Sequence, residues 1–202
     1  MPVLNDAISA FWSLFRERAR DLAVAGAADC AVYDQLLEQL QKVAPGLYLE
    51  FCSDPHECEL IVTAEGNRDL FPIARAIVAA APAIEGWTIR ALKPKIGFPK
   101  TTRWEGFTLR IDDIVFDPLE LDGSDLGLRI FVPGIEAKDV ENAHNAVLRA
   151  LDHGLGEEKF AETVQSTEVR PLPADAAATD YIPLHDLEKF IEWRDGRRKG
   201  AG

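Results

Sequence analysis

Cysteines are few in this chain, and long apolar runs are missing. The three cysteines are Cys30, Cys52 and Cys58, and an odd number of thiols is a poor basis for a disulfide framework. Free thiols are typical of a reducing compartment, so we expect a cytoplasmic protein. No apolar run approaches the roughly 20 residues that span a bilayer. The opening segment MPVLNDAISAFW also lacks the pattern of a secretory signal. We therefore expect no membrane partner.

Positive charge is also scarce. Lys and Arg number 22 against 34 Asp and Glu, which gives a net charge of −12 over 202 residues. Binding to nucleic acid depends on clustered Lys and Arg that displace counterions from the phosphates. We therefore exclude nucleic acid as the main partner and expect any protein partner to be basic. The oligomeric state does not follow from the composition.

Standard motifs of catalysis and cofactor binding are absent from the sequence. It contains no GxxxxGK[ST], complete GxGxxG, HExxH, CxxC or GxSxG pattern. The segment HGLGEE at 153–158 follows an expected helix rather than a strand, so we interpret it as a helix stop. We predict no cofactor and favour a non-enzymatic interaction or regulatory protein. An enzyme whose site assembles from distant residues stays an alternative.

Hydrophobic periodicity predicts an α+β fold. Helical spacing predicts helices over residues 4–22 and 32–40, and alternation then predicts strands at 47–51, 60–64 and 87–91. A helix that starts at Asn67 or Asp69 and ends at Pro82 should precede the last of these strands. After a linker at 94–106 the order repeats, with strands at 113–121 and 126–132 and a helix at 137–153 that stops at Gly154. A polar edge strand at 160–170 and a helix at 184–193 follow.

This order predicts two ββαβ units, preceded by two helices and closed by a C-terminal helix. We expect mostly antiparallel sheets with helices on one face. The chain should form a single globular unit, with pseudo-repeat halves 46–93 and 113–170 joined by the linker 94–106. The aromatic residues Phe11, Trp12 and Phe15 of the first helix should pack on a sheet, because the opposite helix face lacks the basic excess of a membrane-surface helix.

Six carboxylates gather along the second expected hairpin. They are Asp112, Asp113, Asp117, Glu120, Asp122 and Asp125. Their spacing lacks the EF-hand pattern and its terminal glutamate, so a calcium site is not favoured. Two interpretations remain: a solvated hairpin end, which is the more frequent case, and a surface that binds a basic protein. We predict that the hairpin is the contact surface if the protein binds another macromolecule.

Two further groups of residues suggest a site. Cys52, His56 and Cys58 surround one turn, and thiolate and imidazole suit zinc. The register that buries Leu49 together with Val62 places Cys52 and Cys58 on opposite faces, however, so we predict no metal. His144 lies on the core-facing side of its helix, where it is either a pocket residue or an ordinary half-buried histidine. The alternative function is therefore a small-molecule module or an enzyme, with a carboxylate and His144 site between the two halves.

Several segments carry a resemblance. They are ELIVTAEGNRDLFPIARAIVAAAPAIEGWTIRALKP, DDIVFDPLE, GLRIFVPG, LRALDHGLGE and IPLHDLEKFIEW. Together they resemble a widespread, uncharacterised bacterial family of about this length, a domain of unknown function, over most of the chain. The family has no assigned activity, so the resemblance implies no functional residues. The segment EKFAETVQSTEV departs from the more apolar strand that we expect there, which leaves the register of that strand open.

Overall fold

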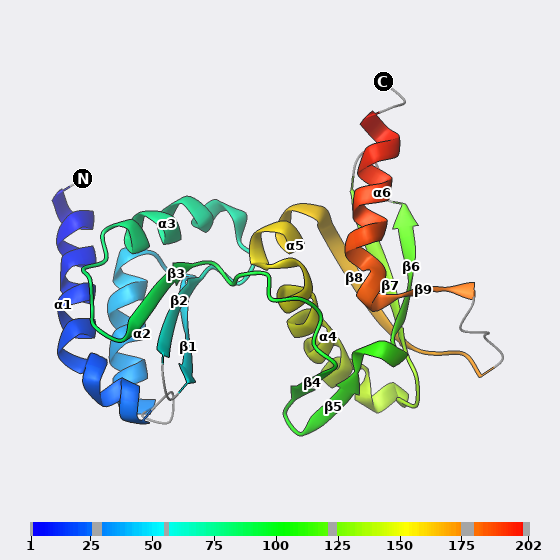
Figure 1. Ribbon diagram of the computed structural model, residues 1–202, viewed down its shortest axis with the longest axis horizontal. Helices are drawn as coiled ribbons and strands as arrows, with labels where there is room; N and C mark the ends of the chain where they lie inside the picture. Colours follow the sequence, from blue (N-terminus) through cyan, green and yellow to red (C-terminus); the bar gives the residue numbers. More distant parts are fainter. Residues whose placement is uncertain (1, 26–29, 55–56, 121–124, 175–179, 200–202) are drawn as a thin grey trace. The chain divides into compact units, whose positions relative to one another are not determined.

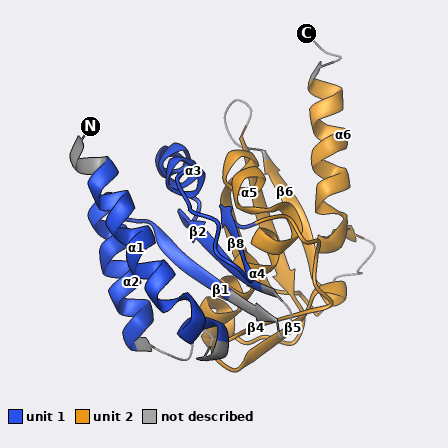
Figure 2. Cartoon of the chain, turned by 60° about the vertical axis from the view of Figure 1, so that its left-hand side comes forward, with its two compact units in different colours: residues 1–93 blue, residues 94–202 orange. Residues whose placement is uncertain are grey.

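The chain divides into two compact units in the computed structural model (Figure 1), which describes residues 2–25, 30–54, 57–120, 125–174 and 180–199. Unit 1 comprises residues 1–93 and unit 2 residues 94–202, as Figure 2 shows in separate colours. The boundary coincides with the start of the segment predicted as a linker, 94–106. Both units combine helices with a small sheet, so the fold is α+β.

Within its described residues, unit 1 contains three α-helices and one sheet. Its elements are α1 (Pro2–Ala25), α2 (Cys30–Val43), β1 (Tyr48–Asp54), β2 (Glu57–Thr63), α3 (Phe71–Ala79) and β3 (Trp87–Ala91). The strand order is β1-β2-β3, with β1 antiparallel and β3 parallel to β2. Leu49 lies opposite Val62 and Phe51 opposite Leu60, so the register predicted for the hairpin is confirmed. β3 is parallel to β2 because α3 carries the chain back to the end of the sheet where β2 begins.

Aromatic side chains attach α1 to this sheet. Phe11, Trp12 and Phe15 are buried, and the ring of Phe15 lies 5.0 Å from that of Trp87 on β3 and 6.5 Å from that of Phe51 on β1. The indole N–H of Trp12 donates to the carbonyl oxygen of Ile77 on α3 at 2.9 Å. The prediction that the aromatic set packs on a sheet is confirmed.

Unit 2 contains two sheets and three α-helices in its described residues. Its elements are β4 (Thr101–Trp104), β5 (Phe107–Arg110), β6 (Val115–Glu120), β7 (Leu126–Val132), α4 (Val140–Leu155), α5 (Glu157–Thr163), β8 (Val164–Pro171), β9 (Ile182–Pro183) and α6 (Leu187–Lys199). β4 pairs with β5, and the larger sheet has the order β8-β7-β6-β9. β7 is antiparallel to β6 and parallel to β8. The prediction that the polar last strand lies at a sheet edge is confirmed.

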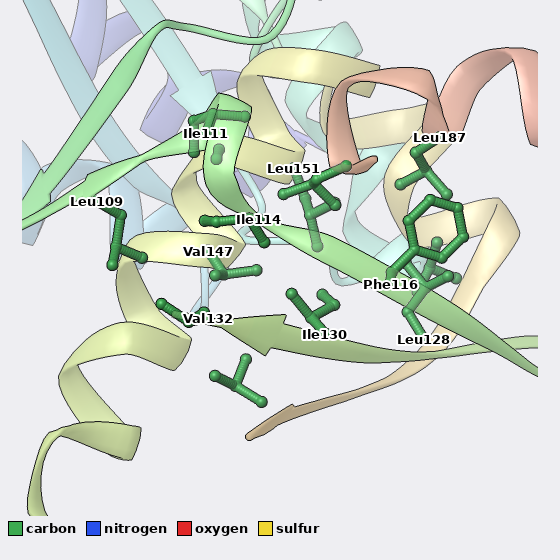
Figure 3. Packing of buried hydrophobic residues seen from close by; sticks show 14 of the residues in the cluster. Leu109, Ile111, Ile114, Phe116, Leu128, Ile130, Val132, Val147, Leu151 and Leu187 are labelled. Carbon is green, nitrogen blue, oxygen red and sulfur yellow. The ribbon is translucent and has the colours of Figure 1, made fainter. Parts of the chain in front are cut away.

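The core of unit 2 lies on one face of this larger sheet. Leu128 and Ile130 of β7 and Phe116 of β6 are fully buried there, together with Val147 and Leu151 of α4 (Figure 3). Leu187 and Ile191 of α6 pack into the same cluster, whose buried members all lie between residues 109 and 191. Because β-strand side chains alternate between faces, Arg129 and Asp117 are placed on the opposite face.

The structure corrects the prediction of a linker over residues 94–106. β4 occupies residues 101–104, and it forms a hairpin with β5 through Glu105 and Gly106, whose φ angles are 44° and 82°. Two consecutive positive φ angles are typical of the tight turns that match strand twist. A glutamate is an unusual first residue for such a turn, so the local residues do not predict a hairpin there.

Three predicted boundaries in unit 2 are also wrong. Residues 160–163, predicted as the start of the last strand, form the end of α5. Gly154 does not stop α4, which continues to Leu155 and is capped by Gly156 with φ 79°. Gly154 instead lies against the ring of Phe98, where a Cβ atom would overlap the ring. α6 ends six residues beyond the predicted Trp193, at Lys199.

Candidate functional site

The acidic residues of the β6–β7 hairpin fall into separate groups. Asp112 and Asp113 belong to a 3₁₀ turn, Ile111–Asp113, that precedes β6, whereas Asp125 lies just before β7. Because β6 and β7 are antiparallel, these two positions are at opposite ends of the hairpin. Six residues of strand separate them by roughly 20 Å. The structure therefore does not gather the predicted carboxylates into one compact cluster.

These carboxylates are exposed and take part in only long ion pairs. The side chain of Asp112 is 63% exposed and its Oδ1 lies 3.9 Å from Nδ1 of His185. Asp113 is 45% exposed, with Oδ2 3.3 Å from Nε of Arg110. Asp125 is exposed, and its backbone carbonyl oxygen accepts a hydrogen bond from Arg194 at 2.9 Å. Exposed ion pairs of this kind contribute about 0–1 kcal/mol, so their role in holding the fold is small.

Asp117 belongs to a row of alternating charges across the outer face of the larger sheet. Its Oδ2 lies 3.9 Å from Nη1 of Arg129, whose Nε donates to Oε2 of Glu168 at 2.9 Å. Glu168 also accepts from Nε of Arg170 at 2.7 Å. The bond from Arg170 and then that from Arg129 lower the pKa of Glu168. On this face the hairpin therefore presents mixed charge.

Two of the six predicted residues lie partly or wholly outside the described residues. Asp122 lies outside the described residues, and so does the side chain of Glu120, although its backbone belongs to β6. The described part of the predicted acidic surface therefore consists of Asp112, Asp113, Asp117 and Asp125.

His144 contacts the edge strand of the larger sheet. Its Nε2 atom lies 2.8 Å from the hydroxyl oxygen of Thr167, so the pair joins α4 to β8 within unit 2. His144 is partly buried. A hydroxyl within hydrogen-bond reach of an imidazole is the first requirement for an activated nucleophile, and a third group that orients the imidazole is the next. The same bond also serves to attach the helix to the strand.

The turn with Cys52, His56 and Cys58, for which we predict no metal, lies partly outside the described residues. His56 and the side chain of Cys52 lie outside the described residues, and Cys58 is buried. In the ladder, Cys52 pairs with Glu59 and Cys58 with Ser53, as the predicted register requires. Among the described residues, His, Cys, Asp and Glu form no group of three that could hold a metal ion.

Unit 1 has a groove between α1 and α3. Its volume is about 430 Å³, and Ile8 and Trp12 of α1 and Ala76 of α3 lie along it. Polar residues of α1, including Ser9 and Arg16, line its rim. The groove is open to solvent and mixed in polarity, whereas small-molecule sites are mostly enclosed and apolar.

A group of three charged side chains in unit 1 joins residues near the ends of its strands. Nζ of Lys93 lies 3.0 Å from Oε1 of Glu65 and 3.3 Å from Oε1 of Glu50, and the lysine side chain is only 11% exposed. Lys93 and Glu65 each follow the carboxyl end of a parallel strand, β3 and β2, which is where α/β sheets often bind ligands. Burial first, and then Glu50 and Glu65, raise the pKa of nearby Tyr33.

Sequence reasoning did not find this group. Its only signal is a charged residue two positions after each of two strands, Glu65 after β2 and Lys93 after β3. That signal has meaning only when β2 and β3 are known to be parallel neighbours. The ammonium group of Lys93 pairs with the carboxylates of Glu50 and Glu65, so this group connects the strands of the sheet.

No protein-family model matches the chain, and no curated protein matches it. Within the residues that the structure describes, no helix is both long and apolar enough to cross a membrane.

Proposed function

We propose that the protein is a non-enzymatic interaction or regulatory protein of the cytoplasm, and that the acidic β6–β7 hairpin binds a basic protein. The observation that carries this proposal is the contrast between two sets of carboxylates. Asp112, Asp113 and Asp117 are 45–63% exposed, and their ion pairs are 3.3–3.9 Å long. Glu188, by comparison, accepts bonds of 2.6 Å from Lys95.

The loosely paired carboxylates are available to a partner at little cost to the fold. A partner that displaces Arg110 from Asp113 breaks an exposed ion pair worth about 0–1 kcal/mol. The net charge of −12 would at the same time accelerate its encounter with a basic protein. Because the two ends of the hairpin are separated, the best match is an extended basic segment that follows β6 from Asp112 to Asp125.

The test uses a basic peptide of alternating lysine and glycine as the probe, with fluorescence anisotropy at low salt. The hairpin variant combines Asp112→Asn, Asp113→Asn, Asp117→Asn and Asp125→Asn. The control variant, with the same change in net charge, combines Asp6→Asn, Glu17→Gln, Asp21→Asn and Glu85→Gln in unit 1. We expect the hairpin variant to bind the peptide about tenfold more weakly than the control.

Equal binding by the two variants would show that only the overall charge attracts the peptide. Equal binding together with a higher melting temperature of the hairpin variant would identify the hairpin as a solvated edge whose like charges repel one another. Both outcomes would overturn the proposal.

We further propose that the two units arose by duplication of a ββαβ element. In each unit an antiparallel hairpin is followed by a helical crossover and a strand parallel to the second strand of the hairpin. These strands are β1, β2 and β3 in unit 1 and β6, β7 and β8 in unit 2. The common strand pairing supports the proposal, whereas the β4–β5 hairpin and α5 of unit 2 have no counterpart in the described part of unit 1.

A further inference from the structure

The outer side of α6 carries an exposed tryptophan. Trp193 is 55% exposed, and its ring lies 5.8 Å from that of Phe190 and 5.2 Å from the guanidinium carbon of Arg197. The buried residues of this helix, Leu187 and Ile191, are on its other side. Figures 1 and 2 show the last turns of α6 extending beyond the strands of unit 2. Tryptophan and arginine are the residue types most enriched at the energetic centres of protein interfaces.

A glycine lies beside this tryptophan, one helical turn further along. Gly196 is exposed, and a Cβ atom added there would have no atom of the described chain within 4 Å. A glycine inside a helix costs about 1 kcal/mol relative to alanine. Nothing in the described part of this chain requires that cost, but a glycine on a helix surface lets a second backbone or a large side chain approach closely.

Trp193, Gly196 and their charged neighbours are arranged symmetrically along the sequence. Glu192 precedes Trp193, and Arg197 follows Gly196. These four exposed residues lie on one side of α6, because residues three and four apart are neighbours on a helix. A two-fold axis midway between residues 194 and 195 would bring a second α6 alongside in the antiparallel direction. It would place Trp193 opposite Gly196 of the second copy, and Glu192 opposite Arg197 of the second copy.

We infer that this side of α6 is a dimer interface that binds a second copy of the same chain. In the two-fold arrangement the large Trp193 lies opposite the small Gly196, and the negative Glu192 lies opposite the positive Arg197. Self-complementarity of this kind is what a two-fold interface requires. Arg197 can keep its contact with Trp193 while its guanidinium pairs with Glu192 of the second copy. Two turns of helix bury less than the roughly 1,200–2,000 Å² of a standard interface. The dimer is therefore weak, with a dissociation constant on the order of tens of micromolar.

The first test measures the molecular mass of the full chain by sedimentation equilibrium over a dilution series. We expect a monomer–dimer equilibrium, and we expect Trp193→Ala to weaken the dimer by at least about tenfold. Gly196→Ala should also weaken it, although the same change stabilises an isolated helix. A chain that is monomeric at a concentration of about 1 mM, well above the expected dissociation constant, would overturn the inference.

The second test uses charge reversal and identifies the two-fold pairing itself. Glu192→Arg places two arginines opposite each other in both pairs, and Arg197→Glu places two glutamates there, so each variant alone should be monomeric. A mixture of the two variants restores both opposite-charge pairs, and a mixed dimer should form. Glu162→Arg, on the exposed side of α5, is the control with the same change in charge and should dimerise like the unchanged chain.

The result of mixing decides between self-association and other uses of this surface. A dimer that survives both charge reversals, or variants that fail to associate when mixed, would rule out the α6 pairing. The acidic hairpin proposal is independent of this result, because its variant alters none of the four α6 residues.

Discussion

At the scale of single residues, two glycines in helices do opposite things. Gly154 of α4 lies against the ring of Phe98, whereas Gly196 of α6 has open space around it. Substitution by alanine should therefore have a steric effect at Gly154 and only an effect on helix propensity at Gly196. The sequence alone does not distinguish these positions, because the ring that excludes a side chain at Gly154 comes from a distant segment.

We expect Gly154→Ala to destabilise the protein by about 1–3 kcal/mol, because the added methyl group forces the Phe98 ring to move. Gly196→Ala should stabilise the monomer by up to about 1 kcal/mol. Chemical denaturation at a concentration where the chain is monomeric measures both changes. Equal effects of the two substitutions would contradict the packing described for Gly154.

Glu168 should make stability depend on pH. Hydrogen bonds from Arg170 and then Arg129 lower its pKa below the ordinary value of 4.5. A carboxylate with a lowered pKa in the folded state stabilises the protein above its ordinary pKa, and this contribution is lost as the pH falls through the lowered pKa. The difference in unfolding free energy between the unchanged protein and Glu168→Gln should therefore be larger at pH 7 than at about pH 3. A difference that does not vary with pH would show that the two arginines do not stabilise the carboxylate.

At the scale of elements, single side-chain bonds attach helices to neighbouring elements. Trp12 connects α1 to the Ile77 carbonyl of α3, and His144 connects α4 to Thr167 of β8. Both bonds join segments that are far apart in sequence. Each can be removed by a single substitution.

Trp12→Phe should destabilise unit 1 by about 1–3 kcal/mol, because the Ile77 carbonyl is left with a single donor and the smaller ring leaves space at a buried position. That donor is the N–H of Ala80, at 3.2 Å. Thermal unfolding followed by far-UV circular dichroism gives the shift. An unchanged melting temperature would mean that the indole N–H contributes nothing to the attachment of α1.

His144→Gln and Thr167→Val test whether the histidine pair has more than a structural role. We expect each to lower stability by about 0.5–1.5 kcal/mol, as for an ordinary side-chain bond, and the double variant to lose much less than the sum. Additive losses in the double variant would show that the two side chains act separately. A stability gain in either variant would favour a functional pair over a structural one.

At the scale of the whole molecule, each unit has a core of its own. In unit 1, Phe11, Leu36 and Leu60 are fully buried, and the core cluster of unit 2 includes only residues of unit 2. A compact unit with its own core can in principle fold alone. We therefore expect fragments 1–93 and 94–202 each to unfold cooperatively on heating, as calorimetry would show. A fragment without a cooperative transition would mean that its unit depends on the other.

Local patterns in the sequence determined most of the elements and the faces they bury. Helical spacing located α1, α2 and α6, and the alternation of Leu49 and Phe51 with polar neighbours determined the register with β2. The polarity of the last strand placed β8 at an edge of its sheet. These features depend on neighbours within one or two turns or strands, so the information that defines them is present in a short stretch of chain.

Tertiary structure decided the features that depend on distant partners. The β4–β5 hairpin required two positive φ angles at a turn without the usual residues, and Gly154 acquired its role only from Phe98. The clamp of Lys93 by Glu50 and Glu65 exists because β3 is parallel to β2. The acidic hairpin was visible as a run of carboxylates, but its division between two ends depends on the antiparallel course of β6 and β7. Ion pairs and close approaches form between segments that the chain brings together only on folding, so no local pattern encodes them.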